Sequence, residues 1–118
     1  MSRILGLDIG AVKTGIAISD ELQLTARPLM VVPTKQLRGE IVQLMESYDI
    51  GRIVVGRPRS LDGSLGQQVA ETKRIVEALQ LPATLELTYE DETATTVENG
   101  TDDAAACGML RGYLAEHR

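Results

Sequence analysis

The chain has 118 residues, of which 43% are hydrophobic and 25% are charged, and its formal net charge is −5. This size and composition predict one globular domain spanning residues 1–118 with an adequate core. No apolar run approaches the ~18 residues of a membrane span, the amino terminus leads directly into a predicted strand, and one cysteine cannot form an internal disulfide, so a cytoplasmic location and no membrane partner are expected. The acidic balance argues against broad adsorption to polyanions, and any such partner must be held locally, by a basic patch or through metal ions.

The first third of the chain predicts strands. Residues 3–9, 14–19 and 24–32 are short apolar or β-branched runs divided by two plausible hairpin connections, which predicts a three-stranded antiparallel meander. Pro28 and Pro33 interrupt the third run, and because proline donates no ladder hydrogen bond, that strand is expected at an edge or a bulge.

Helices and strands alternate in the rest of the chain. Thr34 is expected to cap a helix whose apolar face is made by Leu37, Ile41, Leu44, Met45 and Tyr48. Residues 52–56 predict a buried parallel strand, followed by a loop over 57–64. A second helix, with Val69, Thr72, Val76 and Leu79 on one side, is expected to end at Pro82, before a fifth strand over 83–89 and a last helix over 101–116. The pattern predicts an α/β protein with a five-stranded mixed sheet, in which parallel strands extend the meander and helices flank the sheet.

Asp8 is a carboxylate inside an otherwise apolar strand. Desolvating an aspartate there is costly unless a cation or hydrogen-bond donors compensate, so Asp8 is predicted to be a ligand or a catalytic residue. Gly6, Gly10 and Gly15 are expected to leave room for the close approach of a phosphate or a metal-bound substrate. The alternative is a strand-end aspartate that bonds its own turn.

An acidic run, Glu90-Asp91-Glu92, follows the predicted fifth strand. Three consecutive acids repel one another unless some face solvent or a cation. Ligands of open α/β sheets gather beyond the carboxyl ends of the strands, which favours Glu92 as a site residue. The alternative is a solvated acidic loop that caps the next helix.

Asp102 opens the last predicted helix. Positions 102, 106, 109 and 113 lie on one helical stripe, so Asp102 is expected to point towards the sheet and Asp103 away from it. The alanines at 104–106 let this helix approach the strands closely, which would bring Asp102 near Asp8. The alternative is an N-cap or a partner of the helix dipole.

The three acids are more informative together than singly. A strand aspartate, a strand-end glutamate and a helix-start aspartate that converge on one sheet make an oxygen-ligand site suited to Mg²⁺ or Mn²⁺. Asp8, Glu92 and Asp102 are therefore the predicted metal ligands.

Four groups of residues resemble one known family. They are Gly6 to Gly10 with Lys13, Gly15 and Ser19-Asp20; Ile53 to Pro58 with Asp62-Gly63; Asp91-Glu92 with Thr95-Thr96; and Asp102 with Ala105-Ala106, Leu110, Tyr113 and Leu114. By these motifs, which extend over nearly the whole chain, the sequence resembles the YqgF-type proteins, described as Holliday-junction-resolvase-like proteins or pre-16S rRNA nucleases.

The resemblance implies a ribonuclease H-like fold and a metal-dependent nuclease that hydrolyses phosphodiester bonds, with precursor 16S rRNA as the expected substrate in ribosome biogenesis. It also implies that Asp8, Glu92 and Asp102 form the catalytic set. A Holliday-junction-resolvase-like DNA endonuclease and a non-catalytic nucleic-acid-binding module stay open. The first hairpin is also similar to the phosphate loop of actin-like ATPases and sugar kinases, which normally need a second domain that 118 residues cannot hold. A monomer or a weak homodimer is compatible with the sequence.

Lys13, Arg57 and Arg59 are the predicted phosphate contacts. The two arginines flank Pro58 beyond a predicted strand end, and Lys13 lies in the first hairpin. Ordinary surface charge is the alternative for these cations. His117 is expected to be solvated rather than catalytic.

Two features depart from the family pattern. Thr93-Ala94 stands where the family usually has Arg-Leu, which removes a positive side chain from the site. Residues 97–101 are almost the whole connection to the last helix, where the family continues with a helix and a flexible, basic loop. A deletion, or residues missing from the sequence, is therefore expected between Thr96 and Asp102.

Overall fold

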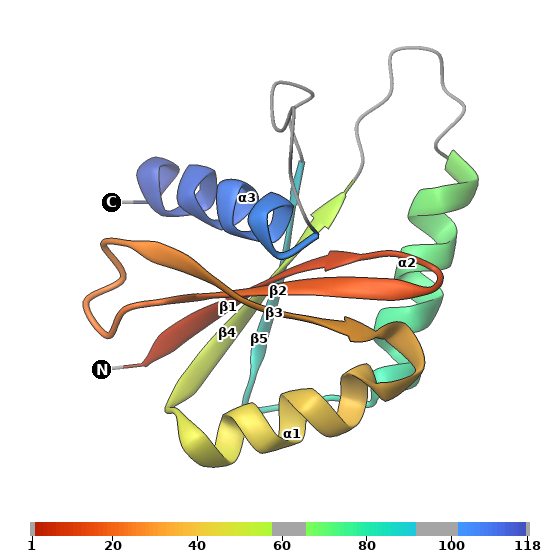
Figure 1. The fold of residues 1–118 in the computed structure, drawn as a ribbon, viewed down its shortest axis with the longest axis horizontal. Helices are drawn as coiled ribbons and strands as arrows, with labels where there is room; N and C mark the ends of the chain where they lie inside the picture. The colour runs from red at the N-terminus through yellow and green to blue at the C-terminus, as the bar shows by residue number, and fades with distance from the viewer. Residues whose placement is uncertain (1, 58–65, 92–101, 118) are drawn as a thin grey trace.

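The computed structural model describes residues 2–57, 66–91 and 102–117, which form one mixed sheet with helices on both faces (Figure 1). The strands are β1 (Arg3–Ile9), β2 (Lys13–Ser19), β3 (Ala26–Pro33), β4 (Ile50–Arg57) and β5 (Glu86–Asp91), in the order β3-β2-β1-β4-β5. The helices are the short 3-10 helix η1 (Thr34–Gln36), α1 (Leu37–Ser47), α2 (Gly66–Leu79) and α3 (Asp102–Glu116). The first three strands pair antiparallel, and β1, β4 and β5 pair parallel, so the predicted meander extended by parallel strands is confirmed.

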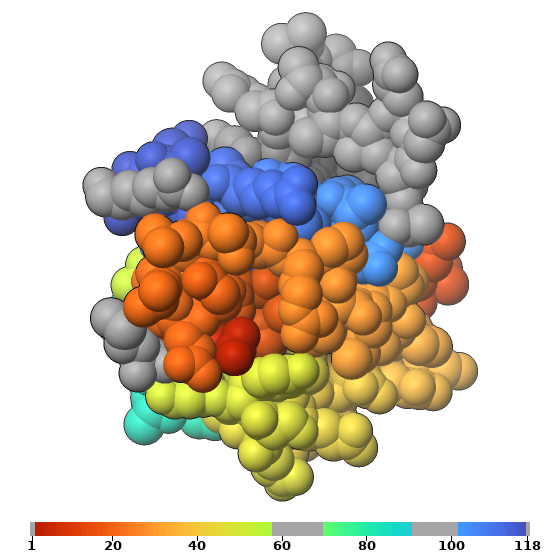
Figure 2. Space-filling view, turned by 60° about the vertical axis from the view of Figure 1, so that its left-hand side comes forward, coloured from red at the N-terminus to blue at the C-terminus, as the bar shows by residue number. Residues whose placement is uncertain are grey.

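The core is divided between the two faces of the sheet. Alternate residues of each strand point to opposite faces. In β1, Leu5 and Leu7 pack with α1 and α2, whereas Ile4 packs with α3. Figure 2 shows α3 and α1 on opposite sides of the strands. Among the described residues, no helix is long and apolar enough to cross a membrane.

Two glycines let α3 approach the sheet closely. A Cβ added to Gly6 would lie 3.0 Å from the Leu110 Cβ, and one added to Gly15 would lie 2.0 Å from the backbone oxygen of Asp102. The expectation that a phosphate or a substrate approaches these two glycines is therefore wrong, because the backbone and side chains of α3 fill that space. The predicted close approach of the last helix to the strands is confirmed.

β3 is an edge strand, as its prolines predict. The register of β2 and β3 shifts between Ile16 and Ala17, opposite the segment that contains Pro28. The strand begins at Ala26 rather than at residue 24, because the backbone N–H groups of Leu24 and Thr25 donate to Asp20 Oδ1, at 2.7 and 2.9 Å. The chain before Ala26 is therefore a turn.

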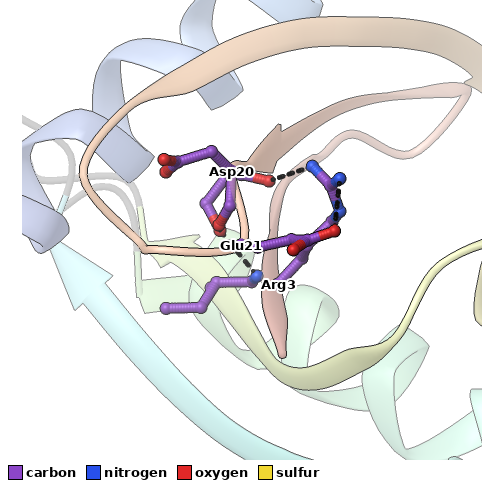
Figure 3. A network of polar contacts seen from close by, with 5 residues as sticks. Arg3, Asp20 and Glu21 are labelled. Carbon is purple, nitrogen blue, oxygen red and sulfur yellow. Dashed lines mark hydrogen bonds and ion pairs between the residues drawn. The ribbon is translucent and has the colours of Figure 1, made fainter. Parts of the chain in front are cut away.

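Arg3 ties the β2–β3 turn to β1. Its guanidinium donates to the Ser19 carbonyl and pairs with Glu21 at 3.4 Å, beside Asp20 (Figure 3). At the same end of the sheet, Arg52 of β4 donates hydrogen bonds to Tyr113 of α3 and to Glu86 of β5. These contacts hold the carboxyl-terminal part of α3 against the sheet.

Three predicted boundaries are wrong for local reasons. Thr34 begins η1 and caps no helix with its side chain, since its hydroxyl donates to the Gly10 carbonyl at 2.6 Å. α2 ends at Leu79 rather than at Pro82, because the next residue, Gln80, adopts a left-handed φ of 49°. The fifth strand starts at Glu86, after a turn in which Leu85 N–H donates to the Pro82 carbonyl.

Candidate functional site

Asp8 lies near the carboxyl end of β1, on the face that α3 covers. It is in phase with Ile4 and Gly6, which both pack against α3. Asp8 is partly buried and pairs with Gly15 across the ladder of β1 and β2. Its carboxylate therefore belongs to the end of the α3 face rather than to the α1/α2 core.

Asp102 is the first residue of α3, and its backbone contacts Gly15. Because Gly15 is also the strand partner of Asp8, the backbones of both aspartates lie beside the same glycine. The Oδ2 atom of Asp102 is buried and accepts no hydrogen bond in the part of the chain that the structure describes. Lys13 Nζ lies 3.6 Å from this oxygen.

Asp103 forms a hydrogen bond with the backbone of its own helix. Its carboxylate accepts a hydrogen bond from the Ala104 N–H at 3.0 Å. Burial raises the pKa of the Cys107 thiol, Arg111 opposes that rise, and the negative charge of Asp103 adds to it. Asp103 lies one helical turn before Cys107, which is buried in the core between α3 and the sheet, so the expectation that Asp103 points away from the sheet stays a prediction.

The hairpin that carries Lys13 is fixed to η1. The Gly10 N–H donates to the Lys13 carbonyl at 3.0 Å, and the Thr34 N–H donates to the Val12 carbonyl at 2.9 Å. The Thr34 hydroxyl also bonds to Thr14 Oγ1 at 2.8 Å. The backbone of Lys13 is thus held in place while its side chain is 67% exposed.

Arg57 lies on the other face of the sheet from Asp8. It is in phase with Ile53 of β4, which packs against α1 and α2. Burial and Glu77 raise the pKa of Tyr89 on that same face, and the positive charge of Arg57 opposes this rise. The predicted contact between Arg57 and a phosphate stays a prediction.

Glu92 and Arg59 lie outside the described residues, and their roles also stay predictions. Glu90 is described, and the strand register gives it a position that the sequence did not single out. Leu7 pairs with Val55, and the next residue of β4, Gly56, pairs with Glu90. Glu90 is therefore on the same face and at the same level as Asp8. The sequence shows an acidic run at the end of this strand, but only the strand register shows that Glu90 lies on the same face as Asp8.

Glu90 also lies near the end of α3. In the described part of the chain, Glu90, Glu116 and His117 bring potential ligand atoms within 4.8 Å of one another. His117 is exposed, as predicted; its Nδ1 lies 2.8 Å from the Tyr113 carbonyl and its ring stacks on Tyr113. Glu90 is partly buried and the other two are exposed, and exposed acidic groups are common without a bound ion.

The residues around Gly15 fit a hard divalent cation. Mg²⁺ and Mn²⁺ prefer carboxylate oxygens, which Asp8 and Asp102 supply. A buried carboxylate oxygen without a hydrogen bond, such as Asp102 Oδ2, is one that a cation would satisfy. The donor chemistry and this buried oxygen thus fit a divalent cation, while the metal site itself stays a prediction.

The sheet order and the position of α3 define a ribonuclease H-like α/β protein. The fold is similar to that of T. thermophilus RuvC in complex with Holliday junction substrate, with a TM-score of 0.66 and 12% identity over 99% of this chain and 96% of that chain. It is also similar to Fowlpox virus resolvase in a complex with Holliday junction DNA, with a TM-score of 0.57 and 11% identity over 98% of each chain. These likenesses concern the fold.

The family follows from the sequence. The model of the family described as "RuvX: Holliday junction resolvase" matches residues 2–116, and the chain belongs to this family. A relative from Lachnospira eligens is 36% identical over 115 residues, covering 92% of this chain and 81% of the relative. A relative from Lactobacillus acidophilus is 32% identical, and the alignment covers 98% of this chain and 98% of the relative. Both relatives carry the name "Putative pre-16S rRNA nuclease", which confirms the resemblance to the YqgF-type proteins.

The relatives also bear on the length of the chain. The alignment with the Lactobacillus acidophilus protein runs over 139 residues, although this chain has 118. That relative therefore has residues without a counterpart here. The connection predicted to be shortened, residues 97–101, lies outside the described residues, so its position as the site of the difference stays a prediction.

Proposed function

We propose that the protein is a divalent-metal-dependent nuclease that hydrolyses phosphodiester bonds in precursor 16S rRNA, and so acts in ribosome biogenesis. The observation that carries the proposal is the convergence of Asp8 and Asp102 on Gly15, on one face of a ribonuclease H-like sheet. Support for the substrate comes from the names of the relatives from Lachnospira eligens and Lactobacillus acidophilus.

Asp8, Glu92 and Asp102 would hold Mg²⁺ or Mn²⁺ through carboxylate oxygens. Such an ion supplies an activated water and stabilises negative charge on the leaving oxygen. The chain itself contributes the rigid support: Gly15 sets how closely Asp102 approaches the strands, and the β1–β2 ladder fixes Asp8 beside it. No serine or histidine nucleophile is required.

Lys13, Arg57 and Arg59 are proposed to contact phosphates of the substrate. Cations that meet phosphates position a nucleic acid without reading its sequence. Specificity for a precursor rRNA would then depend on the shape and the single-stranded ends of the RNA. With a net charge of −5, the protein depends on such local contacts rather than on its overall field.

A Holliday-junction DNA endonuclease is the second candidate. It is favoured by the description of the family as a Holliday junction resolvase and by the likeness of the fold to RuvC. The shorter chain and Thr93-Ala94 favour a third candidate, a binding module without catalysis, because both reduce the expected grip on the substrate.

One experiment separates these functions. Labelled precursor 16S rRNA, an unrelated single-stranded RNA and a four-way DNA junction are each incubated with the protein in Mg²⁺, Mn²⁺ or EDTA. We expect cleavage of the precursor rRNA with either metal and none in EDTA. We expect Asp8→Asn to abolish it, because the neutral amide is a poor ligand for a hard cation.

The matched control is Asp49→Asn. Asp49 is exposed and lies beside the start of β1, at the opposite end of the sheet from Asp8. This variant should cleave like the wild type. Preferential cleavage of the four-way junction would support the second candidate, and binding without cleavage under every metal condition would support the third.

A further inference from the structure

Lys13 and Asp102 form an ion pair inside the candidate metal site. Lys13 Nζ lies 3.6 Å from Asp102 Oδ2, and the two side chains are 67% and 34% exposed. Oδ2 itself is buried and accepts no hydrogen bond from the described residues. The ammonium of Lys13 is thus the cation that compensates this oxygen in the structure.

We propose that Lys13 is an internal counter-ion that competes with the divalent cation for Asp102. The inference rests on the proposed function, since it concerns the same metal site. When no divalent ion is present, Lys13 neutralises the Asp102 carboxylate. Binding of the ion requires Lys13 to release that oxygen.

The geometry of the pair suits such an exchange. A charge-assisted hydrogen bond between an ammonium and a carboxylate is about 2.7–2.9 Å long, and the 3.6 Å separation is too long for one. The contact is therefore mainly electrostatic and is easily broken. The backbone of Lys13 is held by Gly10, while its long side chain reaches into solvent and can swing away without disturbing β2.

The release of Lys13 also gives it a second partner. Once the ion holds Asp102, the ammonium is free beside the site where a substrate phosphate would lie. Lys13 then acts as the phosphate contact that the sequence predicts. One side chain would in this way link the loading of metal to the binding of substrate.

Titration with Mn²⁺ in the absence of nucleic acid tests the competition. Isothermal titration calorimetry is performed on the wild type, Lys13→Gln, Lys13→Arg and Lys35→Gln. An exposed ion pair is worth up to about a fivefold change in an equilibrium constant. We therefore expect Lys13→Gln to bind Mn²⁺ about threefold to fivefold more tightly. Lys13→Arg retains the competing charge and should stay within about twofold of the wild type.

Lys35→Gln controls for the general loss of a positive charge. Lys35 is exposed in η1, which is hydrogen-bonded to the same hairpin, and forms no ion pair with another described residue. An equal gain in Mn²⁺ affinity for Lys35→Gln and Lys13→Gln would overturn the proposal. Absence of Mn²⁺ binding by the wild type would instead refute the proposed metal site, and the competition with it.

Unfolding in EDTA provides a readout that needs neither metal nor activity. Lys13→Gln should lower the urea midpoint of the wild type and leave that of Asp102→Asn unchanged, because the pair no longer exists in that background. The same loss of stability in both backgrounds would show that Lys13 does not compensate Asp102, and the proposal would be wrong.

Discussion

Gly15 connects the parts of the candidate site. It pairs with Asp8 across two strands and contacts the backbone of Asp102, so two carboxylates separated by more than ninety positions in the sequence meet at one residue. The contact is with main-chain atoms, which cannot rotate away as a flexible side chain can. The identity of this single residue therefore decides whether α3 can begin over the site.

Replacing Gly15 with alanine should destabilise the protein. The new Cβ would lie 2.0 Å from the Asp102 carbonyl oxygen, so α3 must shift. We expect the free energy of unfolding to fall by about 2 kcal/mol, within the range for overpacked cores, together with loss of nuclease activity. Gly39→Ala is the control, because nothing lies within 4 Å of its added Cβ. In α1 that change should stabilise by about 0.5–1 kcal/mol. Urea unfolding measures both, and equal midpoints for the two variants would contradict the account.

Lys13 and Arg57 show that the face of the sheet on which a residue lies is difficult to predict from the sequence. Both are cations near strand ends, and the sequence treats them alike. The structure separates them, because Lys13 is in phase with Gly15 on the α3 face and Arg57 is in phase with Ile53 on the other. Which face a residue takes depends on the register of the pairing, and a shift of one residue would exchange the faces.

At the scale of elements, η1 braces the hairpin that carries Lys13. The Thr34 hydroxyl donates to the Gly10 carbonyl and bonds to Thr14 Oγ1, which is fully buried. A threonine just before a helical pattern is predicted to be the N-cap of that helix, because this prediction uses only the residues next to it in the sequence. It cannot predict a partner twenty positions away.

Thr34→Val should therefore cost about 1–3 kcal/mol of unfolding free energy, because it leaves the buried Thr14 hydroxyl and the partly buried Gly10 carbonyl without their partner. The substitution keeps the shape of the side chain, so the loss reports the hydrogen bonds rather than packing. Thr25→Val, at an exposed position of the β2–β3 turn, should change the free energy by less than about 0.5 kcal/mol. Chemical denaturation compares the two variants. A Thr34→Val loss as small as that of Thr25→Val would show that η1 does not brace the hairpin.

The turn between β2 and β3 makes folding sensitive to acid. Hydrogen bonds from the backbone N–H of Thr25, and then of Leu24, lower the pKa of Asp20 below its ordinary value of 3.8. A lowered folded-state pKa stabilises the fold above the unfolded-state pKa, and this contribution is lost as the pH falls through the folded-state value. Asp20→Asn should therefore be less stable than the wild type at pH 6, and the difference should shrink as the pH falls below about 4. Thermal melts between pH 6 and pH 3 test this. A difference independent of pH would exclude the carboxylate as its source.

At the scale of the whole molecule, much of the fold follows from patterns that are local in sequence. The runs that contain Leu5 and Ile53 predict buried strands. Ala106, Met109 and Tyr113 predict the helix face that packs on the sheet. The site depends on contacts that are not local. The role of Gly15 is set by a helix that begins 87 positions later, and no spacing in the sequence reports such a contact.

The net negative charge of the protein opposes its binding to a polyanion, and this leads to a last prediction. With a net charge of −5, binding to RNA depends on local contacts between single cations and phosphates. If the three proposed cations each contact one phosphate, affinity for single-stranded RNA should depend only moderately on salt, because the slope of log K against log salt is about −0.7 for each phosphate contact and so about −2 for three. Between 50 and 200 mM KCl at constant Mg²⁺, we expect affinity to fall by about twentyfold or less. Fluorescence anisotropy with Asp8→Asn measures binding without cleavage. A fall of a hundredfold or more would mean that many phosphates are contacted, and that cations outside the described residues dominate the grip on RNA.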